Sequence, residues 1–167
     1  MKTKDNLKAA FSGESQANRK YLAFAKKAEQ EGYPVIANLF RAVAEAETLH
    51  AHTHLRNMGG IHNSTLENLK EAMAGEDYEV TEMYPGMVAT AEAEGEKRAA
   101  QGMRQAMEVE KVHSDLYKQA IAALEQGQDL DHEVLRICGV CGHTVFGDAP
   151  DQCPVCGAKQ SAYVKVA

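Results

Sequence analysis

The sequence predicts an all-α four-helix bundle followed by a small β-rich ribbon held together by a metal ion. Residues 5–127 are rich in Ala, Glu, Lys, Met and Leu, which are strong helix formers. All four cysteines lie within Cys138–Cys156, where the helical periodicity has ended. A C-terminal piece of about 34 residues buries too little apolar surface to fold alone, so we expect the cysteines to stabilise it by holding a metal ion. The expected domains are therefore a bundle of residues 1–130 and a ribbon of residues 134–167.

The composition excludes several classes of protein. The chain of 167 residues is 44% hydrophobic and 25% charged, which is the usual balance of a globular protein. Its net charge of −6 offers no basic surface for nucleic acid. No apolar run approaches the roughly 18 residues that cross a bilayer, and the first residues lack an apolar signal-peptide core. We therefore expect a cytoplasmic protein with neither a nucleic-acid nor a membrane partner.

Apolar periodicity and helix-breaking residues place the helices. Four long helices are expected, at about 4–31, 35–58, 76–94 and 97–126. Gly32 and the proline that follows separate the first two. A short connecting helix is expected at 64–74, with Ser64 or Thr65 as its N-cap and Glu67 in its first turn. Pro85 lies inside the third helical pattern and is expected to kink or loosen it.

An internal repeat relates the two halves of the helical region. At an offset of 63 residues the matching pairs are Tyr21/Tyr84, Ala28/Ala91, Gly32/Gly95, Ala37/Ala100, Glu47/Glu110 and His50/His113. One residue out of register, Gly13-Glu14 also matches Gly75-Glu76. The bundle is therefore expected to consist of two copies of one helical hairpin.

Each hairpin carries the donors of a metal site. Two Glu-x-x-His pairs are present, Glu47 with His50 and Glu110 with His113. The members of each pair share one helical face, with Cβ atoms about 5–6 Å apart. Glu14 lies 33 residues before the first pair, and Glu76 lies 34 residues before the second. Two facing hairpins of this kind match the carboxylate-bridged di-metal site of ferritin-like bundles, and such ligands suit iron or manganese.

Further residues are candidates at this site. Glu79 and Glu82 lie one and two turns beyond the first carboxylate of the second hairpin, and spacing alone leaves the choice between them open. His54, one turn beyond the first Glu-x-x-His pair, is likewise open. Tyr21 and Tyr84 lie about two turns beyond the first carboxylate of each hairpin. Their hydroxyls are expected to bond a ligating carboxylate; the alternative is that both are plain core aromatics.

The cysteines form two Cys-x-x-Cys knuckles separated by eleven residues: Cys138, Cys141, Cys153 and Cys156. Paired knuckles at this separation give tetrahedral four-thiolate coordination of zinc or iron. A glycine follows each knuckle, which lets backbone N–H groups turn toward the sulfurs. The ligands alone leave the metal open. Iron is favoured because a di-iron site that turns over needs electrons, which zinc cannot supply.

Together these motifs resemble those of the rubrerythrins, and the resemblance covers nearly the whole chain. It rests on Gly13-Glu14-Ser15-Gln16-Ala17, Glu47-x-x-His50, Gly75-Glu76-x-x-Glu79-x-x-Glu82-Met83-Tyr84-Pro85, Glu110-x-x-His113 and the double Cys-x-x-Cys. The resemblance implies a ferritin-like di-iron bundle with a C-terminal rubredoxin-like domain.

The resemblance also implies a role for each ligand. The bridging carboxylates would be Glu47 and Glu110, and the terminal ligands Glu14, Glu76 and His113. Glu79 and His50 would be alternative ligands of one iron, the carboxylate in the oxidised state and the histidine in the reduced state. Glu82 would not be a ligand. The four cysteines would hold a mononuclear iron.

The implied function is that of a non-haem di-iron peroxidase that reduces hydrogen peroxide to water in oxidative-stress defence. Electrons would come from NAD(P)H through a separate reductase or rubredoxin, and pass through the Fe(Cys)4 centre to the di-iron site. The family also implies a head-to-tail homodimer or a higher homo-oligomer. The alternatives are a ferroxidase or iron-storage protein and a binding module stabilised by a zinc ribbon. A metal count separates the three, because they predict about three irons per chain, many irons, or zinc in the ribbon.

Overall fold

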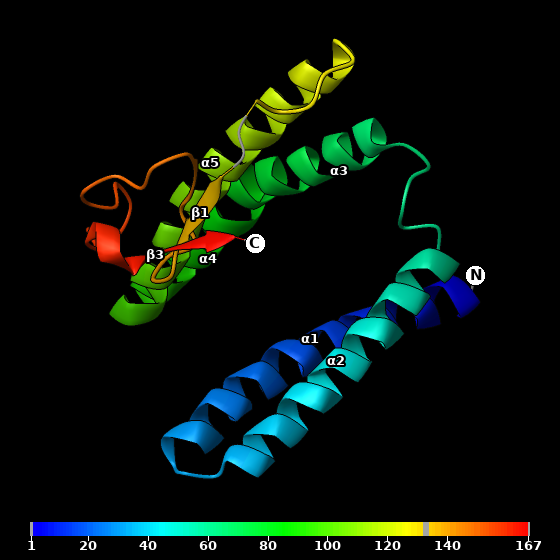
Figure 1. The fold of residues 1–167 in the computed structure, drawn as a ribbon, viewed down its shortest axis with the longest axis vertical. Helices are drawn as coiled ribbons and strands as arrows, with labels where there is room; N and C mark the ends of the chain where they lie inside the picture. The colour runs from blue at the N-terminus through cyan, green and yellow to red at the C-terminus, as the bar shows by residue number, and fades with distance from the viewer. Residues whose placement is uncertain (1, 132–133, 167) are drawn as a thin grey trace. The chain divides into compact units, whose positions relative to one another are not determined.

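The structure is a computed structural model that describes residues 2–131 and 134–166. The chain divides into two compact units, Met1–Asn63 and Ser64–Ala167. Each unit holds one antiparallel helical hairpin, and the second also carries the strands (Figure 1). Within the described residues no helix is both long and apolar enough to cross a membrane.

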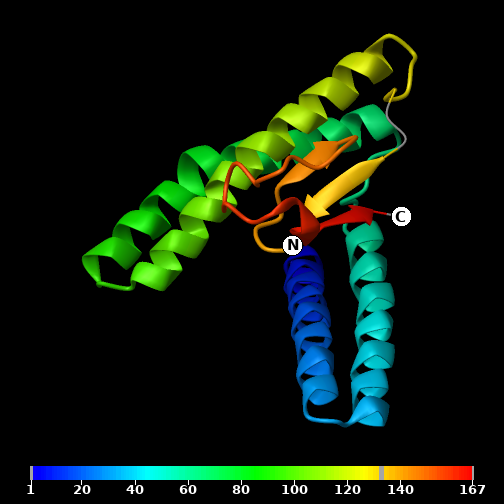
Figure 2. The ribbon, with the colours of Figure 1, turned by 60° about the vertical axis from the view of Figure 1, so that its left-hand side comes forward.

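The first unit consists of α1 (Lys2–Gln30) and α2 (Pro34–Asn57), which run side by side (Figure 2). Small side chains line the seam between them: Ala25, Ala28, Ala37, Ala44 and Ala51 are all buried. The three alanines of α2 recur every seven residues, which keeps them on one face of the helix. Because alanine is small, the two backbones approach closely along this seam.

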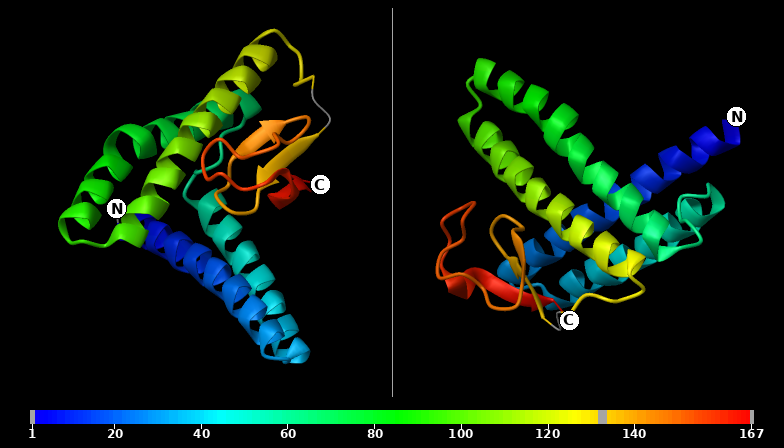
Figure 3. Two further views of the ribbon diagram at one scale, coloured as in Figure 1. Left: turned by 90° about the vertical axis from the view of Figure 1, so that its left-hand side faces the viewer. Right: turned by 90° about the horizontal axis from the view of Figure 1, so that it is seen from above.

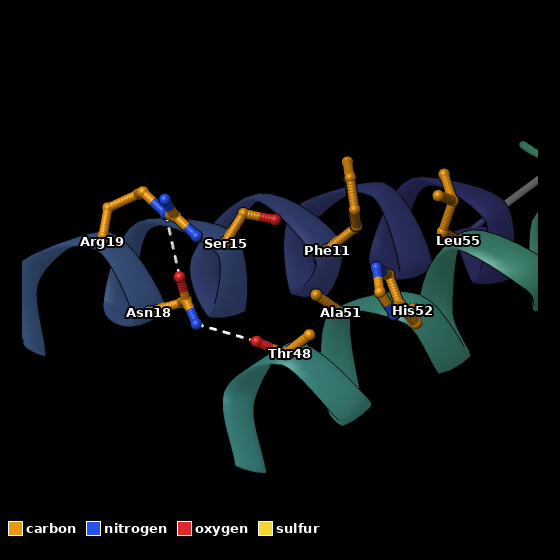
Figure 4. A pocket seen from close by; sticks show the side chains of 8 residues that line it. All are labelled: Phe11, Ser15, Asn18, Arg19, Thr48, Ala51, His52 and Leu55. Atoms are coloured by element: carbon orange, nitrogen blue, oxygen red, sulfur yellow. Dashed lines mark hydrogen bonds between the residues drawn. The ribbon is translucent and has the colours of Figure 1, made fainter. Parts of the chain in front are cut away.

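A buried amide fixes the register of this hairpin. Asn18 donates hydrogen bonds to the carbonyl of Ala44 at 2.7 Å and to Oγ1 of Thr48 at 2.8 Å, while Arg19 donates to its Oδ1 at 2.9 Å (Figure 4). Asn18, Arg19 and Thr48 border a hollow of about 280 Å³ between the helices. Leaving such an amide unpaired would cost about 1–3 kcal/mol. The bonds therefore hold α2 in register immediately beside Glu47, which precedes Thr48 in the sequence.

The second unit begins with one continuous helical run. It comprises α3 (Thr65–Tyr78), the turn η1 (Glu79–Met83) and α4 (Tyr84–Ala93). Its N-cap is Ser64, whose hydroxyl accepts a hydrogen bond from the Glu67 N–H at 3.2 Å. Ser64 is one of the two residues predicted for this position. The prediction of a separate connecting helix at 64–74 was wrong. Gly75 continues the helix instead of ending it, because a single glycine costs only about 1 kcal/mol there.

The turn η1 is π-helical. The Tyr84 N–H donates to the carbonyl of Glu79, five residues back, instead of four. Such turns are wider than α-helical ones and occur frequently at functional sites. This one lies directly before Pro85, which has no N–H to continue the ladder. The loosening expected near Pro85 is therefore present, and it takes the form of a π turn.

The π turn also explains the register shift within the repeat. Glu14 and Glu76 are 62 residues apart, whereas Tyr21 and Tyr84 are 63 residues apart. The second hairpin thus has one extra residue between these two positions, and η1 lies between them. A π turn is the form in which an α-helix accommodates one extra residue.

The two hairpins close with the same turn. α5 (Lys97–Glu125) follows α4 and packs antiparallel to both α3 and α4 (Figure 3). Gly32 and Gly95 end the first helix of each hairpin with φ values of 83° and 77°, which favour glycine. The matching closing bonds run from the Tyr33 N–H to the Ala28 carbonyl at 2.9 Å and from the Glu96 N–H to the Ala91 carbonyl at 2.8 Å. The structure thus supports the predicted repeat.

Three short antiparallel strands form the ribbon: β1 (Leu135–Cys138), β2 (Thr144–Phe146) and β3 (Tyr163–Val166). Their order is β2-β1-β3, and Arg136 of β1 lies opposite Val145 and Lys165. The buried core residues are Cys138, Ala149, Cys153 and Tyr163. Strand β2 contacts α5 of the same chain (Figure 3). The predicted fold class, a helical region followed by a small β-rich metal ribbon, is confirmed.

Candidate metal centres

The four cysteines of the ribbon form one cluster. Their sulfur atoms lie within 4.8 Å of one another, and all four cysteines are free thiols. The sulfurs of Cys138 and Cys156 are 3.7 Å apart, and those of Cys141 and Cys153 are 3.6 Å apart. A tetrahedral ion with metal–sulfur bonds of about 2.3 Å requires sulfur–sulfur distances of about 3.8 Å. These two distances therefore match those expected around a four-thiolate metal ion.

Backbone N–H groups converge on these sulfurs, as expected from the glycine after each knuckle. The N–H groups of His143 and Ala158 donate to the sulfurs of Cys141 and Cys156. The phenol of Tyr163 hydrogen-bonds Cys153 and lies 2.8 Å from Nδ1 of His143. Hydrogen bonds of this kind stabilise negative charge on sulfur.

The ionisation of Cys153 follows from this environment. Burial by itself raises the pKa of the thiol, but the Tyr163 hydroxyl and the N–H groups of Val155 and Cys156 outweigh it and lower the pKa to about 6. Burial raises the pKa of the Cys141 thiol to about 12. One thiolate is thus present near neutral pH, and a bound cation displaces the remaining protons.

A second group of donors lies in the helices of the second unit. Carboxylate and imidazole atoms of Glu76, Glu110 and His113 lie within 4.8 Å of one another. The carboxylate Oε2 of Glu110 is 2.7 Å from Nδ1 of His113. Glu76 comes from α3 and the other two from α5, so packing of these helices assembles the group. Oxygen and imidazole donors in this ratio suit iron or manganese.

The two carboxyl groups of this site hold a proton between them when no cation is bound. Burial, together with a hydrogen bond to Glu110 and the charge of that residue, raises the pKa of Glu76 to about 7, while the charge of His113 opposes the rise. Two adjacent carboxylates repel each other unless a proton or a cation lies between them. The site is thus suited to exchange this proton for a metal ion.

This raised pKa predicts a pH dependence of stability in metal-free protein. Between about pH 4.5 and 7 the folded chain binds more protons than the unfolded chain, so the free energy of unfolding falls as the pH rises. The Glu76→Gln variant is expected to flatten this part of the profile. The measurement is urea unfolding of chelator-treated protein at a series of pH values. Glu108→Gln, an exposed residue of α5, is the control, and identical slopes in the wild-type and Glu76→Gln proteins would contradict the prediction.

The third group of donors lies in the first unit. Atoms of Glu14, Glu47 and His50 lie within 4.8 Å of one another, and Oε2 of Glu47 is 2.8 Å from Nδ1 of His50. The Glu47 side chain is 15% exposed, whereas the His50 ring is 58% exposed. The carboxylate is therefore held by packing, and the imidazole has freedom to move.

Three further polar side chains lie near the second-unit group. The pKa of Glu79 is raised by burial and by the charge of Glu110. Burial and the neighbouring carboxylates, Glu79 first, raise the pKa of Tyr84. Tyr117 of α5 was not predicted, yet burial and the charges of Glu76 and Glu110 raise its pKa in the same way. Tyr117 lies one helical turn after the second Glu-x-x-His pair, and this spacing could have identified it from the sequence as a residue near the site.

The remaining candidates lie as follows. Tyr21 packs against Phe24 and Phe40, with ring centroids 6.3 Å from each, which is the arrangement of a core aromatic. Glu82 is exposed. His54 is partly buried, and its Nδ1 is buried without a hydrogen-bond partner among the described residues.

A helical region with two Glu,Glu,His groups, followed by a four-cysteine ribbon, defines a ferritin-like non-haem metalloprotein with an appended thiolate centre. Comparison with known families gives two matches. The family described as "Rubrerythrin" matches residues 5–121, and "Rubrerythrin, rubredoxin-like domain" matches residues 137–164. The chain belongs to the rubrerythrin family.

Characterised relatives match over nearly the whole length. Rubrerythrin-2 of Clostridium acetobutylicum is 34% identical over 96% of this chain and 95% of that protein. The rubrerythrin of Porphyromonas gingivalis is 37% identical over 97% of this chain and 88% of that protein. Among solved structures, nigerythrin in a partially reduced state matches with a TM-score of 0.59 and 31% identity, over 98% of this chain and 86% of that one.

Membership in this family establishes the metal complement and the class of protein. The cofactors are a di-iron carboxylate centre and a rubredoxin-like iron held by four cysteines. The protein is an oxidoreductase of the type associated with oxidative stress.

Proposed function

We propose that this chain is a peroxidase that reduces hydrogen peroxide to water with electrons relayed through its ribbon. The helical ligands are Glu14, Glu47, His50, Glu76, Glu79, Glu110 and His113. The ribbon ligands are Cys138, Cys141, Cys153 and Cys156. The observation that carries the proposal is the contact of β2 with α5, because it joins the ribbon to the helix that bears Glu110 and His113.

The reaction takes two electrons and two protons for each peroxide, which leaves as two water molecules. When bound, the two irons supply these electrons and act as a template for the substrate. The protein holds the carboxylates in place through packed helices and the hydrogen bonds described above. Tyr84 and Tyr117, whose pKa values are raised by burial and by the charges of these carboxylates, are the hydroxyl groups that we expect to donate hydrogen bonds to them.

The four cysteines would hold an iron that supplies one electron at a time, so each turnover would need two electron transfers from the ribbon to the helical centre. The electron source is NAD(P)H, through a separate reductase or rubredoxin. We also propose that the protein acts in the cytoplasm as a homodimer or higher homo-oligomer. Exposed apolar residues on α2 support self-association: Val35, Leu39 and Leu49 are 79%, 62% and 61% exposed.

The test uses iron-loaded protein reduced without air and mixed with limiting hydrogen peroxide. Rapid return of the thiolate-to-iron charge-transfer absorption is the expected result, because electrons then leave the ribbon to refill the helical centre. A colourless protein would indicate zinc in the ribbon and would overturn the relay. Colour that returned much faster with dioxygen than with peroxide would identify an oxidase instead.

His50→Ala is expected to lower peroxide turnover sharply, by about 10-fold or more, while iron stays bound. The ring of His50 is 58% exposed beside a packed Glu47, which suits a ligand used in only one oxidation state. Steady-state kinetics and iron content are the two measurements. His52→Ala, another exposed histidine of α2, is the matched control. Unchanged turnover in His50→Ala would count against exchange of ligands between His50 and Glu79.

A further inference from the structure

Thr144 connects the ribbon to a metal-ligand candidate of the helices. It is the first residue of β2, and its Oγ1 lies 3.0 Å from Nε2 of His113 on α5. Both residues belong to the second unit. The ring of His113 is 26% exposed, so this contact is partly buried.

The direction of this hydrogen bond follows from the second partner of Thr144. Its hydroxyl has one hydrogen, which it donates to the carbonyl of Gly142 at 3.0 Å. A hydroxyl that has donated its hydrogen acts as an acceptor toward any other partner. Nε2 of His113 is therefore the donor and carries a hydrogen.

The other ring nitrogen faces the carboxylates. Nδ1 of His113 lies 2.7 Å from Oε2 of Glu110, which in turn hydrogen-bonds Glu76. When a cation displaces the proton from this side, the Nδ1 lone pair becomes available at the centre of the group. The hydrogen bond to Thr144 keeps the remaining proton on Nε2 and fixes the rotation of the ring.

We propose that Thr144 is a positioning residue for His113, and that the ribbon thereby supplies the outer hydrogen-bond partner of a ligand in the helical metal centre. The inference rests on the proposed function, in which His113 binds metal. Ligating histidines usually donate their second N–H to a fixed acceptor, which sets the ring orientation and makes the ligand more basic. Here the acceptor belongs to the ribbon instead of to a helix.

The surroundings offer little to replace the threonine hydroxyl. Thr144 and His113 border a cavity of about 330 Å³, whose other walls are apolar side chains such as Leu116 and Phe146 together with Tyr117. A valine at position 144 would have nearly the same shape as threonine but no acceptor. The Nε2–H would then lose the acceptor that it has here, and a ring without its acceptor loses a fixed orientation.

The contact also joins the two metal centres through few atoms. The N–H of His143, the residue before Thr144, donates to the sulfur of Cys141. The segment of His143 and Thr144 thus bonds a ligand of each centre. Because only the Thr144 side chain is changed in the test, the backbone bond to Cys141 stays in place and the ribbon serves as an internal reference.

The experiment compares Thr144→Val with Thr144→Ser in the full-length protein. One equivalent of Zn²⁺ is added first, which the thiolates take, and the helical centre is then titrated with Co²⁺ as a spectroscopic probe. Thr144→Val is expected to weaken Co²⁺ binding about 10–100-fold, whereas Thr144→Ser stays close to the wild type because it keeps the hydroxyl. Thr90→Val is the matched control, since the Thr90 hydroxyl donates to the carbonyl of Gly86 within its own helix α4.

A second readout reports the hydrogen bond itself. In the Co²⁺-loaded protein, the exchangeable N–H proton of His113 gives a shifted proton resonance that disappears in D2O. Thr144→Val is expected to accelerate its exchange with solvent, and Thr144→Ser to preserve it. Wild-type affinity together with wild-type exchange in Thr144→Val would overturn the positioning role alone. Failure of the wild-type protein to bind Co²⁺ at the helical centre would overturn the proposed function as well.

Discussion

Replacing Glu110 with alanine is expected to remove iron from the helical centre and to reduce peroxide turnover by more than about 100-fold. Glu110 contacts both other members of its group, because its carboxylate bonds Nδ1 of His113 at 2.7 Å and shares a hydrogen bond with Glu76. Alanine removes one negative charge and one of the two carboxylates expected to bridge the irons, which weakens the hold of the remaining donors on both ions. Metal analysis is expected to find about one iron per chain, the iron that the thiolates hold.

Glu108→Ala is the control for this variant. Glu108 lies on the same helix, is 50% exposed and pairs with Lys111 at 2.6 Å on the protein surface. It has the same charge and helix propensity as Glu110 but lies outside the group of donors, so iron content and turnover should stay unchanged. A Glu110→Ala protein with its full complement of iron would show that this carboxylate is not a ligand.

Replacing Cys138 with alanine is expected to abolish turnover supported by NAD(P)H and a reductase. Cys138 is 1% exposed, and its sulfur is 3.7 Å from that of Cys156. Three thiolates cannot complete a tetrahedral site, and the ribbon has too small a core to fold without its metal. The helical centre does not use this ligand, so chemically reduced protein should still consume one equivalent of peroxide.

Rapid mixing separates these two parts of the reaction. The thiolate-to-iron absorption should be absent in Cys138→Ala, while the single reaction of the reduced helical centre with peroxide keeps its rate. Val140→Ala, two residues along and 66% exposed, should behave as the wild type in both measurements. Full reductase-linked turnover in Cys138→Ala would mean that electrons reach the helical centre by another route.

The features that the sequence predicted well depend on local chemistry. Ser64 caps α3 because a serine hydroxyl can accept from an N–H three residues on, and this bond forms wherever the segment lies. The positions of the glycine turns in both hairpins depend on local sequence in the same way. So do the positions of the two Cys-x-x-Cys knuckles. Placement of Glu47 beside His50, and of Glu110 beside His113, follows from helical geometry alone.

The features that the sequence did not predict depend on contacts between distant elements. Tyr117 and Thr144 carry no motif, and their importance arises only where α5 meets the carboxylates or β2. The continuous run from α3 to α4 was divided between two expected helices, 64–74 and 76–94, because the glycine between them was expected to separate them, whereas the packing of α3 on α5 keeps the run continuous. The one-residue mismatch in the repeat did mark the position of η1, but a mismatch could equally have indicated a loop.

A duplicated hairpin alone would give two equivalent metal positions. One inserted residue, absorbed in the π turn of Glu79–Met83, breaks that equivalence. Counting back 63 or 62 residues from Glu79 reaches Gln16 or Ala17, so this carboxylate has no counterpart in the first hairpin. The extra residue of η1 and the unmatched Glu79 lie in the same stretch of the second hairpin, so the two halves differ there both in length and by one negative charge. A repeat that would pair two equal metal positions thus presents a chemically unequal pair.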